Sequence, residues 1–294
     1  MRPPRSAVSP PAVDRGPRYA KGFCGGNDFV LLIDPDDDVR LTRGAVRGLC
    51  DRYRGLGGDG VLRLVRTEFA DPALAGDAEW FMDCRNPDGT VAPMCGPGLG
   101  LVARYLLDAG LIAPGEVWIG TSVGAKRTVI DDSGTTSIEL LPPEFLGSSS
   151  VRLGGREYPG SVISLGNLHL VCFVTTPVET LDLSAEPVLA DPGFGDADLD
   201  ITWANVLADG RLRTRVYEPG TGEMRSCGTA VCAAAAARQR SEGAWGTTVV
   251  DTDAGPLSVT LRGHGKTVFT GEASVAALGT LNTTWITSLD KEPS

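Results

Sequence analysis

The chain has 294 residues, of which 42% are hydrophobic, and it carries a formal net charge of −10 with a sequence pI near 4.8. That length accommodates one or two domains with sizeable cores, and the acidic balance argues against nucleic acid or an anionic membrane surface as a partner. No apolar run approaches the roughly 20 residues that span a bilayer, so no membrane span is expected.

The N-terminus and the cysteines indicate a cytoplasmic protein. Residues 1–18 are rich in proline and arginine and have no apolar stretch, which predicts a disordered extension and not a secretory signal. The seven cysteines are odd in number and contain no CxxC pair, which favours free thiols in a reducing compartment over a disulfide framework. Because the histidines are two, His169 and His264, no metal site is expected.

The first half of the chain alternates short strands with helices. Asn86-Pro87-Asp88-Gly89 is a strong turn signal. After it, Cys95-Gly96-Pro97-Gly98 opens an apolar helix that ends near Gly110, a residue type suited to a helix C-cap. A further helical pattern covers 41–53, and strands are predicted at 29–34, 60–65, 80–85 and within 117–130.

The second half repeats this order. Cys227-Gly228-Thr229 opens an alanine-rich helix that runs to about Gly243. Strands are predicted at 137–141, 161–165, 169–174 and 213–217, followed by a hairpin of 248–251 with 257–261. Strands, a turn and a Cys-Gly helix therefore occur twice. We expect two similar α+β domains, at 19–133 and 134–277, with a strand from about 278–290 returning to the first and a ligand cleft between them.

The two cysteines at the starts of the Cys-Gly helices are candidate catalytic residues. A thiol at a helix N-terminus sits where the helix dipole and free N–H groups favour negative charge. A free cysteine is more often a small buried hydrophobe, which is how we interpret Cys172 and Cys232. The paired setting of Cys95 and Cys227 favours a functional reading, in which one thiol removes a proton from one face of a carbon and the other supplies one to the opposite face. Cys84 lies close to this predicted site, two residues before Asn86.

Three other features have alternative interpretations. Residues 55–60 look like a phosphate-binding loop, but a strand and not a helix follows them, so we interpret them as a turn. His169 lies at the edge of an apolar strand and fits a structural role as well as a functional one. Glu218 precedes Pro219-Gly220 and fits an acidic side chain of a surface turn as well as a functional residue.

Six motifs, in order, resemble the diaminopimelate epimerase family from about Gly22 to Gly271. They are Gly26-Asn27-Asp28-Phe29, residues 55–60, residues 86–89, Met94-Cys95-Gly96, Gly166-Asn167-Leu168-His169, and Arg215-Val216-Tyr217-Glu218 with Gly222-Glu223 and Ser226-Cys227-Gly228-Thr229. The resemblance implies an α/β fold of two pseudo-symmetric domains, each with strands wrapped around a central helix. It also implies inversion of an amino-acid α-carbon without a cofactor, by two cysteines in the interdomain cleft.

The resemblance also implies roles for individual residues. Cys95 and Cys227 would exchange the proton, His169 would lie beside Cys95, and Glu218 would meet an ammonium or a thiol. Backbone N–H groups at the two helix starts would hold the substrate carboxylate; they belong to Gly96, Gly98, Gly228 and Thr229. Four asparagines would bind the polar groups of the substrate: Asn27, Asn86, Asn167 and Asn205. The implied partner is a small-molecule amino acid, and a homodimer is common in the family. The four lysines lie in no motif that suggests a pyridoxal Schiff base.

Three residues depart from the family pattern. Pro97 stands where the family usually has asparagine, which deletes a backbone donor from the helix start. Pro219 replaces an arginine that clamps the distal carboxylate of diaminopimelate, a contact that proline does not supply. Leu168 replaces a usual proline.

The sequence therefore favours an epimerase or racemase acting on an amino acid other than diaminopimelate. The first alternative is a genuine diaminopimelate epimerase in which another arginine, Arg213 or Arg225, binds the distal carboxylate. The second is a catalytically silent relative that binds an amino acid or senses redox state.

Overall fold

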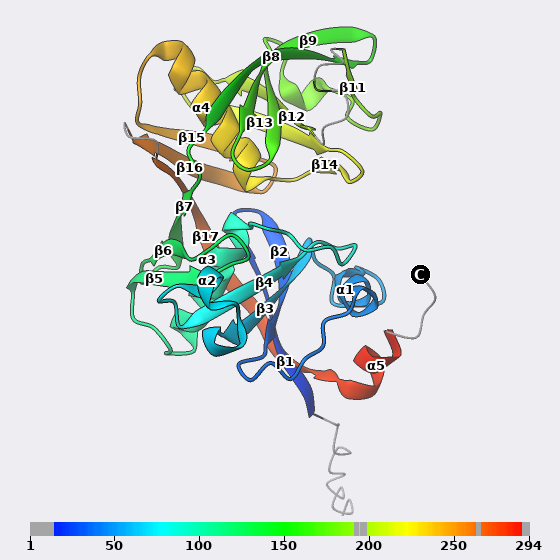
Figure 1. Cartoon of the computed structure of the whole chain (residues 1–294). Coiled ribbons are helices and arrows are strands. Elements are labelled where there is room, and N and C mark those ends of the chain that lie inside the picture. The colour runs from blue at the N-terminus through cyan, green and yellow to red at the C-terminus, as the bar shows by residue number, and fades with distance from the viewer. Residues whose placement is uncertain (1–14, 191–193, 195–198, 263–265, 290–294) are drawn as a thin grey trace, which may run out of the picture.

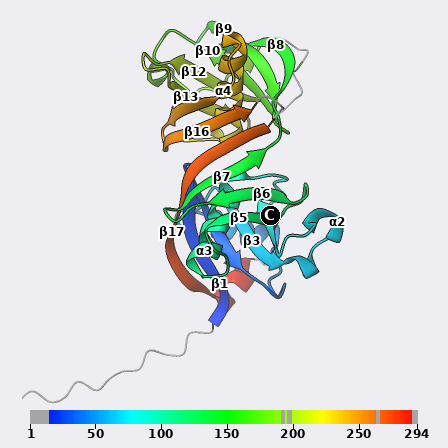
Figure 2. The same cartoon turned by 90° about the vertical axis from the view of Figure 1, so that its left-hand side faces the viewer.

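The computed structural model describes residues 15–190, 194, 199–262 and 266–289. Two lobes lie one above the other, and strands β7 (Thr135–Leu140) and β17 (Lys266–Asn282) run between them (Figure 1). Figure 2 shows these two strands side by side at the junction, where they pair antiparallel over Thr267↔Leu140 to Glu272↔Thr135. No helix among the described residues is long and apolar enough to cross a membrane.

The first lobe is a closed series of strands around helix α3 (Gly96–Asp108). Each strand pairs with the next, and β17 pairs back to the first. The remaining strands are β1 (Arg15–Cys24), β2 (Asn27–Ile33), β3 (Gly60–Arg66), β4 (Trp80–Arg85), β5 (Gly115–Gly120) and β6 (Lys126–Ile130). Residues 96–103 of α3 are apolar and buried inside these strands, and the Arg104–Asp108 ion pair lies in the accessible C-terminal half of the helix.

The second lobe repeats the plan around helix α4 (Gly228–Glu242). Its strands are β8 (Glu144–Leu153), β9 (Arg156–Ser164), β10 (Leu168–Phe173), β11 (Val188–Leu189), β12 (Leu199–Val206), β13 (Leu212–Glu218), β14 (Gly222–Met224), β15 (Thr247–Thr252) and β16 (Gly255–Arg262). The five consecutive alanines 233–237 are buried, and their small side chains let strands approach the helix closely. Gly243 ends the helix with φ 66°, a left-handed conformation that suits glycine.

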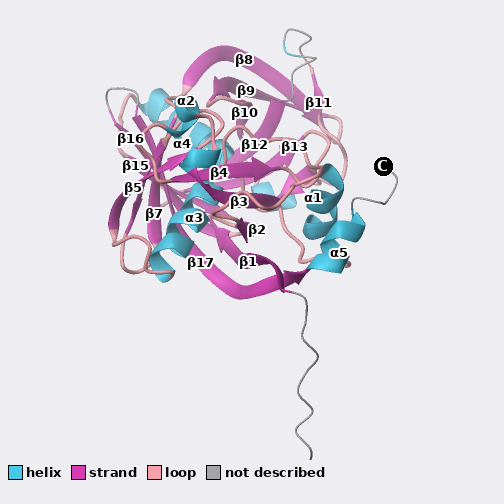
Figure 3. Cartoon of the chain, turned by 60° about the horizontal axis from the view of Figure 1, so that its bottom comes forward, coloured by secondary structure: helices cyan, strands magenta, loops and turns pink. Residues whose placement is uncertain are grey.

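Shorter elements lie outside these two centres. Figure 3 shows α3 and α4 among strands, whereas α1 (Arg43–Cys50) and α5 (Thr283–Ser288) lie together at the edge of the molecule. The others are α2 (Pro72–Ala75) and the short 3₁₀ helices η1 (Thr67–Phe69) and η2 (Val178–Thr180). The fold thus confirms the predicted architecture of two pseudo-symmetric domains with a helix inside each set of strands.

Two predictions about the ends of the chain are corrected. Strand β1 begins at Arg15, within the segment predicted to be disordered, because Arg15 pairs with Asn282 and Arg18 pairs with Ile33 and Thr280; residues 1–14 lie outside the described part of the chain. The strand predicted over 278–290 ends at Asn282, whose side chain accepts a hydrogen bond from the N–H of Trp285 and so caps helix α5.

Candidate active site

The N-termini of the two central helices meet at a pocket between the lobes. Two ring carbons of Pro97, at the start of α3, lie 3.3 and 3.5 Å from the position that a Cβ would take at Gly228, the first residue of α4. The pocket has a volume of about 170 Å³, and both Cys95 and Cys227 line it. Of the other residues in the predicted site, Asn27, Asn86, Gly96, Glu218, Gly228 and Thr229 also line this pocket.

Cys95 is surrounded by hydrogen-bond donors. It is the N-cap residue of α3, and its Sγ accepts a hydrogen bond from the backbone N–H of Gly98 at 3.3 Å. The thiol of Cys84, on β4, also hydrogen-bonds to Cys95. The bond from Cys84 and then that from Gly98 hold the pKa of Cys95 below its usual value, against the opposing effect of burial. Cys95 is therefore the thiol of the pocket that is favoured as a thiolate.

Cys227 has acidic neighbours. It is the N-cap residue of α4, and its Sγ lies 3.4 Å from the hydroxyl of Thr229. Burial, followed by the negative charges of Glu218 and Asp200, raises its pKa well above the usual value. Burial also raises the pKa of Glu218, which is hydrogen-bonded to Cys227. Cys227 is therefore favoured as the protonated thiol.

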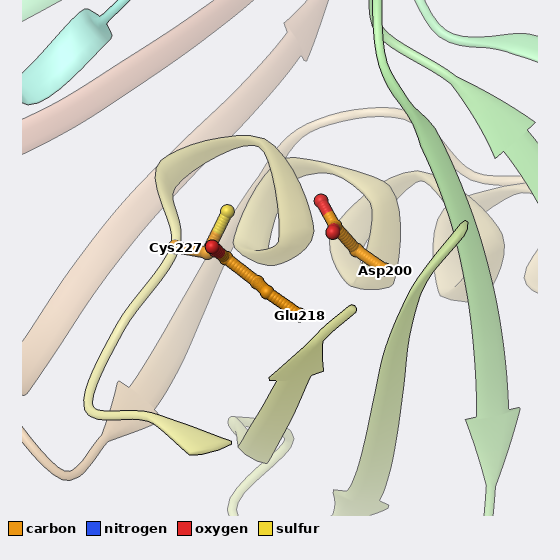
Figure 4. Close-up of side chains that lie close together, drawn as sticks. All are labelled: Asp200, Glu218 and Cys227. Atoms are coloured by element: carbon orange, nitrogen blue, oxygen red, sulfur yellow. The ribbon is translucent and has the colours of Figure 1, made fainter. Parts of the chain in front are cut away.

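Asp200, Glu218 and Cys227 form a cluster at the pocket edge. They come from the start of β12, the end of β13 and the start of α4, and their carboxylate oxygens and Sγ all lie within 4.8 Å of one another (Figure 4). The side-chain amide of Asn167 donates to Asp200 at 2.9 Å and to the hydroxyl of Thr229 at 3.2 Å. Asn167 therefore supports the cluster instead of lining the pocket. Two carboxylates and a thiol of this kind attract a cation.

Asp200 is the member of the cluster that sequence reasoning missed. Nothing in the residues around Asp200 distinguishes it from other acidic residues before an apolar strand. Its place follows from the parallel pairing of β10 with β12, which sets Asp200 opposite His169. That pairing joins segments more than thirty residues apart and has no local signature.

Two asparagines line the first-lobe side of the pocket. The side-chain amide of Asn27 donates to Asp59 Oδ2 and to the carbonyl of Ser226, each at 3.4 Å, so it connects the two lobes. The amide of Asn86 donates to the hydroxyl of Thr90 at 3.0 Å. Both residues line the pocket, and their role in binding polar substrate groups stays a prediction.

Comparison with known proteins places this geometry in a family. A family model described as diaminopimelate epimerase matches residues 19–142 and 161–276. The chain is 46% identical to the diaminopimelate epimerase of Thermobifida fusca over 226 residues, or 75% of this chain and 82% of that protein. The chain belongs to the diaminopimelate epimerase family. It is 38% identical to the Streptomyces coelicolor relative over 91% of this chain and 96% of that one. This family member is an isomerase.

Solved structures share its fold at low sequence identity. A hydroxyproline epimerase from Agrobacterium vitis superposes with a TM-score of 0.67 at 16% identity, over 92% of each chain. A probable proline racemase from Agrobacterium radiobacter superposes with a TM-score of 0.65 at 16% identity, over 91% of this chain and 93% of that one. These similarities confirm the predicted two-lobed fold.

The expected place of His169 is wrong. The structure puts it on β10 in the second lobe, 0% exposed, with Nδ1 3.6 Å from Asp200 Oδ2. It does not line the pocket, and neither ring nitrogen has a hydrogen-bond partner among the described residues. Burial lowers its pKa to about 3, so the ring is neutral. His169 therefore lies next to Asp200 on the Cys227 side of the site, and not beside Cys95.

Asn205 is also misassigned by the resemblance. Its side-chain oxygen accepts from the N–H of Val178 at 2.8 Å, and its amide donates to the carbonyls of Val174 and Thr176 at 2.7 and 2.9 Å. These bonds use both amide hydrogens, so Asn205 anchors the turn before η2, and it does not line the pocket. Gly98 is buried and does not line the pocket either; its N–H donates to Cys95 Sγ.

The two arginines considered for the distal carboxylate differ in their surroundings. Arg213 pairs with Glu179 at 2.7 Å and with Asp253, and it does not line the pocket. Arg225 lines an adjoining cavity of about 550 Å³, which shares Asn27, Asp59 and Met224 with the pocket. Its guanidinium donates to the carbonyl of Asp253 at 3.1 Å.

Proposed function

We propose that this chain is a diaminopimelate epimerase that converts the LL form to the meso form by moving a proton between Cys95 and Cys227. One observation carries this proposal: two thiols, each at the N-terminus of a central helix, line the same pocket, and their pKa values are shifted in opposite directions. The matched relatives that bear this name support the substrate.

The chemistry requires a base and an acid on opposite faces of one carbon. The α-hydrogen of an amino acid is weakly acidic, and inversion needs its removal from one face and the return of a proton to the other. The Cys95 thiolate takes the proton, and the Cys227 thiol delivers one. In the reverse direction the two thiols exchange roles. No cofactor takes part in this scheme.

Backbone donors stabilise the charge that develops on the carboxylate. The N–H groups of Gly96, Gly228 and Thr229 lie at the two helix starts, where the helix dipoles favour an anion. Pro97 has no N–H, so α4 provides more of these donors than α3. The substrate ammonium is held by Glu218 and Asp200, whose carboxylates lie close together beside Cys227.

The distal carboxylate needs a cation that Pro219 does not supply. Arg225 is the better placed of the two arginines, because it lines the cavity next to the pocket whereas Arg213 is held in two ion pairs. We expect Arg225→Gln to raise KM for LL-diaminopimelate about tenfold with a small change in kcat. Arg127→Gln, which removes a guanidinium paired with Glu116 away from the site, is the matched control. An unchanged KM would assign the distal carboxylate to another group.

Two alternatives remain testable. An epimerase or racemase of another amino acid is favoured by Pro219, whereas the family match and the named relatives favour diaminopimelate. A silent relative that binds an amino acid would keep its affinity when either thiol is replaced by serine, and an enzyme would lose turnover.

The test is α-proton exchange in deuterated water under reducing conditions, followed by NMR, without added cofactor. Purified protein is given LL-diaminopimelate and a panel of single-centre L-amino acids. Deuterium in diaminopimelate, with conversion to the meso form, supports the proposal. Exchange confined to a single-centre amino acid overturns the substrate assignment and leaves the two-thiol chemistry standing. Silence across all substrates, with retained amino-acid binding, identifies a silent relative.

A further inference from the structure

The cluster of Asp200, Glu218 and Cys227 has the composition of a metal site. Two carboxylate oxygens and a sulfur, one atom from each residue, lie within 4.8 Å of one another (Figure 4). Zn²⁺ binds thiolate sulfur and carboxylate oxygen at about 2.0–2.3 Å, which places tetrahedral ligand atoms about 3.5 Å apart. Small rotations of the three side chains therefore bring their ligand atoms around one ion. The count of histidines predicted no metal site, but this cluster needs none as a ligand.

We propose that the cluster binds Zn²⁺ through the Sγ of Cys227 and one carboxylate oxygen each of Glu218 and Asp200, and that the bound ion blocks the site. Zn²⁺ replaces the proton of the Cys227 thiol, and this proton passes to the buffer. The sulfur then has no proton to give to a substrate carbon. The binding site stands on the geometry of the cluster, and only its effect on turnover rests on the proposed function.

A buried histidine without a partner is aimed into the cluster. His169 is 0% exposed, and neither of its ring nitrogens has a hydrogen-bond partner among the described residues. Its Nδ1 lies 3.6 Å from Asp200 Oδ2, just beyond the length of a hydrogen bond. A neutral imidazole carries one N–H, and donors behind a metal-bound carboxylate fix its orientation. When Asp200 turns toward an ion, the ring of His169 can complete this hydrogen bond.

The ligand residues are held within one lobe. They come from β12, β13 and α4, which pack against one another, so the site does not depend on how the two lobes meet. The amide of Asn167 donates to Asp200 Oδ2 at 2.9 Å and holds that carboxylate in place. Arg85, which lines the pocket, donates to both carboxylate oxygens of Asp83 at 2.8 and 3.0 Å, so its charge is already paired.

The proposed ion faces the space that the substrate enters. Glu218 and Cys227 line the pocket, and Zn²⁺ with three protein ligands keeps a fourth position for water or a substrate group. The carboxylates that bind the ion are also those proposed to hold the substrate ammonium. Zn²⁺ and the substrate therefore exclude each other.

Co²⁺ binding tests the site without a substrate. Untagged protein, kept reduced with a phosphine, is titrated with Co²⁺, whose thiolate charge-transfer band reports a cysteine ligand, and Zn²⁺ affinity is measured by displacement of Co²⁺. Cys227→Ser, Glu218→Gln and Asp200→Asn each remove one ligand. Cys95→Ser is the matched control, because it removes the thiol that lines the same pocket from the first lobe. Circular dichroism verifies that each variant is folded.

The wild type and Cys95→Ser should show the charge-transfer band at one Co²⁺ per chain, and Cys227→Ser should lose it. Glu218→Gln and Asp200→Asn should each weaken Zn²⁺ binding about tenfold or more, because a neutral amide is a poorer ligand than a carboxylate. His169→Leu should weaken it about tenfold through the lost support of Asp200. A wild type without the band, a band that persists in Cys227→Ser, or unchanged Zn²⁺ affinity in Asp200→Asn overturns the inference.

Kinetics separate the metal site from the proposed function. Zn²⁺ should inhibit epimerisation competitively with LL-diaminopimelate, and a chelator should restore the rate. Full turnover with the site occupied by Zn²⁺ would overturn the blocking effect. If the wild type does not turn over diaminopimelate, the proposed substrate fails, while the Co²⁺ spectra and the Zn²⁺ affinities still decide the metal site.

Discussion

Cys95 and Cys227 occupy equivalent positions in the two lobes, but their surroundings are opposite in character. Each is the N-cap residue of a helix enclosed by strands. Around Cys95 the contacts are donors, from Gly98 and Cys84. Around Cys227 they are the carboxylates of Glu218 and Asp200. The symmetry thus belongs to the backbone, and side chains from neighbouring strands make the two thiols chemically different.

The difference between the two surroundings bears on which of the two thiols carries the proton. The proposed reaction needs one thiolate and one thiol, and two identical thiols in one pocket would share a single proton equally. Here the two sets of neighbours shift the pKa values in opposite directions, which favours the thiolate at Cys95 and the thiol at Cys227. The following tests either abolish that asymmetry or measure it.

The largest expected effect is the loss of either thiol. Cys95→Ser and Cys227→Ser should each lower the rate of epimerisation by about 10³-fold or more, because a serine hydroxyl is a far weaker base than a thiolate. Deuterium exchange by NMR measures this. Cys172→Ser, a buried thiol in the second-lobe core, is the control and should keep activity. A serine variant that retained exchange would exclude that thiol from the chemistry.

The second test weakens the acidic surroundings of Cys227. Glu218→Gln removes one negative charge, so the pKa of Cys227 should fall and its alkylation at pH 7 should become about tenfold faster. Alkylation of Cys95 should not change, and KM should rise because the ammonium loses a partner. Glu242→Gln is the control, since Glu242 pairs with Arg238 in the last turn of α4, away from both cavities. Equal effects on both thiols would show that the two surroundings are not independent.

The third test concerns the contact between the helix starts. A Cβ at Gly228 would lie 3.3 Å from Pro97, whereas a Cβ at Gly96 would lie 3.4 Å from one methyl group of Leu140. Gly228→Ala should therefore separate the two N-termini and lower kcat/KM about tenfold, and Gly96→Ala should have a smaller effect. Steady-state kinetics measures both. Similar losses in the two variants would mean that the separation of the helices is not the cause.

The smallest expected effect is on the pH dependence of the free energy of unfolding, and it comes from His169, on the Cys227 side of the site. His169 is buried as a neutral ring with a pKa of about 3, below the value of an unfolded histidine near 6.5. Between these pH values the unfolded chain binds a proton that the folded chain does not, so the free energy of unfolding falls as pH is lowered.

The histidine contribution is expected to approach a slope of about 1.4 kcal/mol per pH unit. Urea unfolding at pH 7.5, 5.5 and 4.5 should show a weaker pH dependence in His169→Leu than in the wild type. The same slope in both would mean that His169 is protonated in the folded chain.

Local patterns predicted helices α1, α3 and α4 and the hairpin of β15 with β16. Strand β4 lies at Trp80–Arg85 as expected from the apolar run, and both Cys-Gly helices begin at the predicted glycine. The family motifs pointed to Asn27, Asn86 and Glu218, and all three line the pocket. These features depend on residues that are close in sequence or on motifs with a specific order.

The remainder depended on pairing between distant segments. Strands β1 and β8 were not predicted, and β17 was predicted only over its last residues, 278–282, because glycines and charged residues interrupt their apolar alternation and their partners lie far along the chain. His169 and Asn205 were assigned by resemblance, and burial and local hydrogen bonds give them other roles. Asp200 came to the site through a parallel strand pairing that leaves no mark in the surrounding residues.

Strand β17 has a consequence for how the molecule unfolds. Its first part, from Lys266, pairs with β16 of the second lobe, and its last part, to Asn282, pairs with β1 at the other end of the chain. Without this strand, β1, β7 and β16 each lose a pairing partner, and neither lobe is complete. Because β17 pairs with strands of both lobes, we expect the two lobes to unfold together and not one after the other.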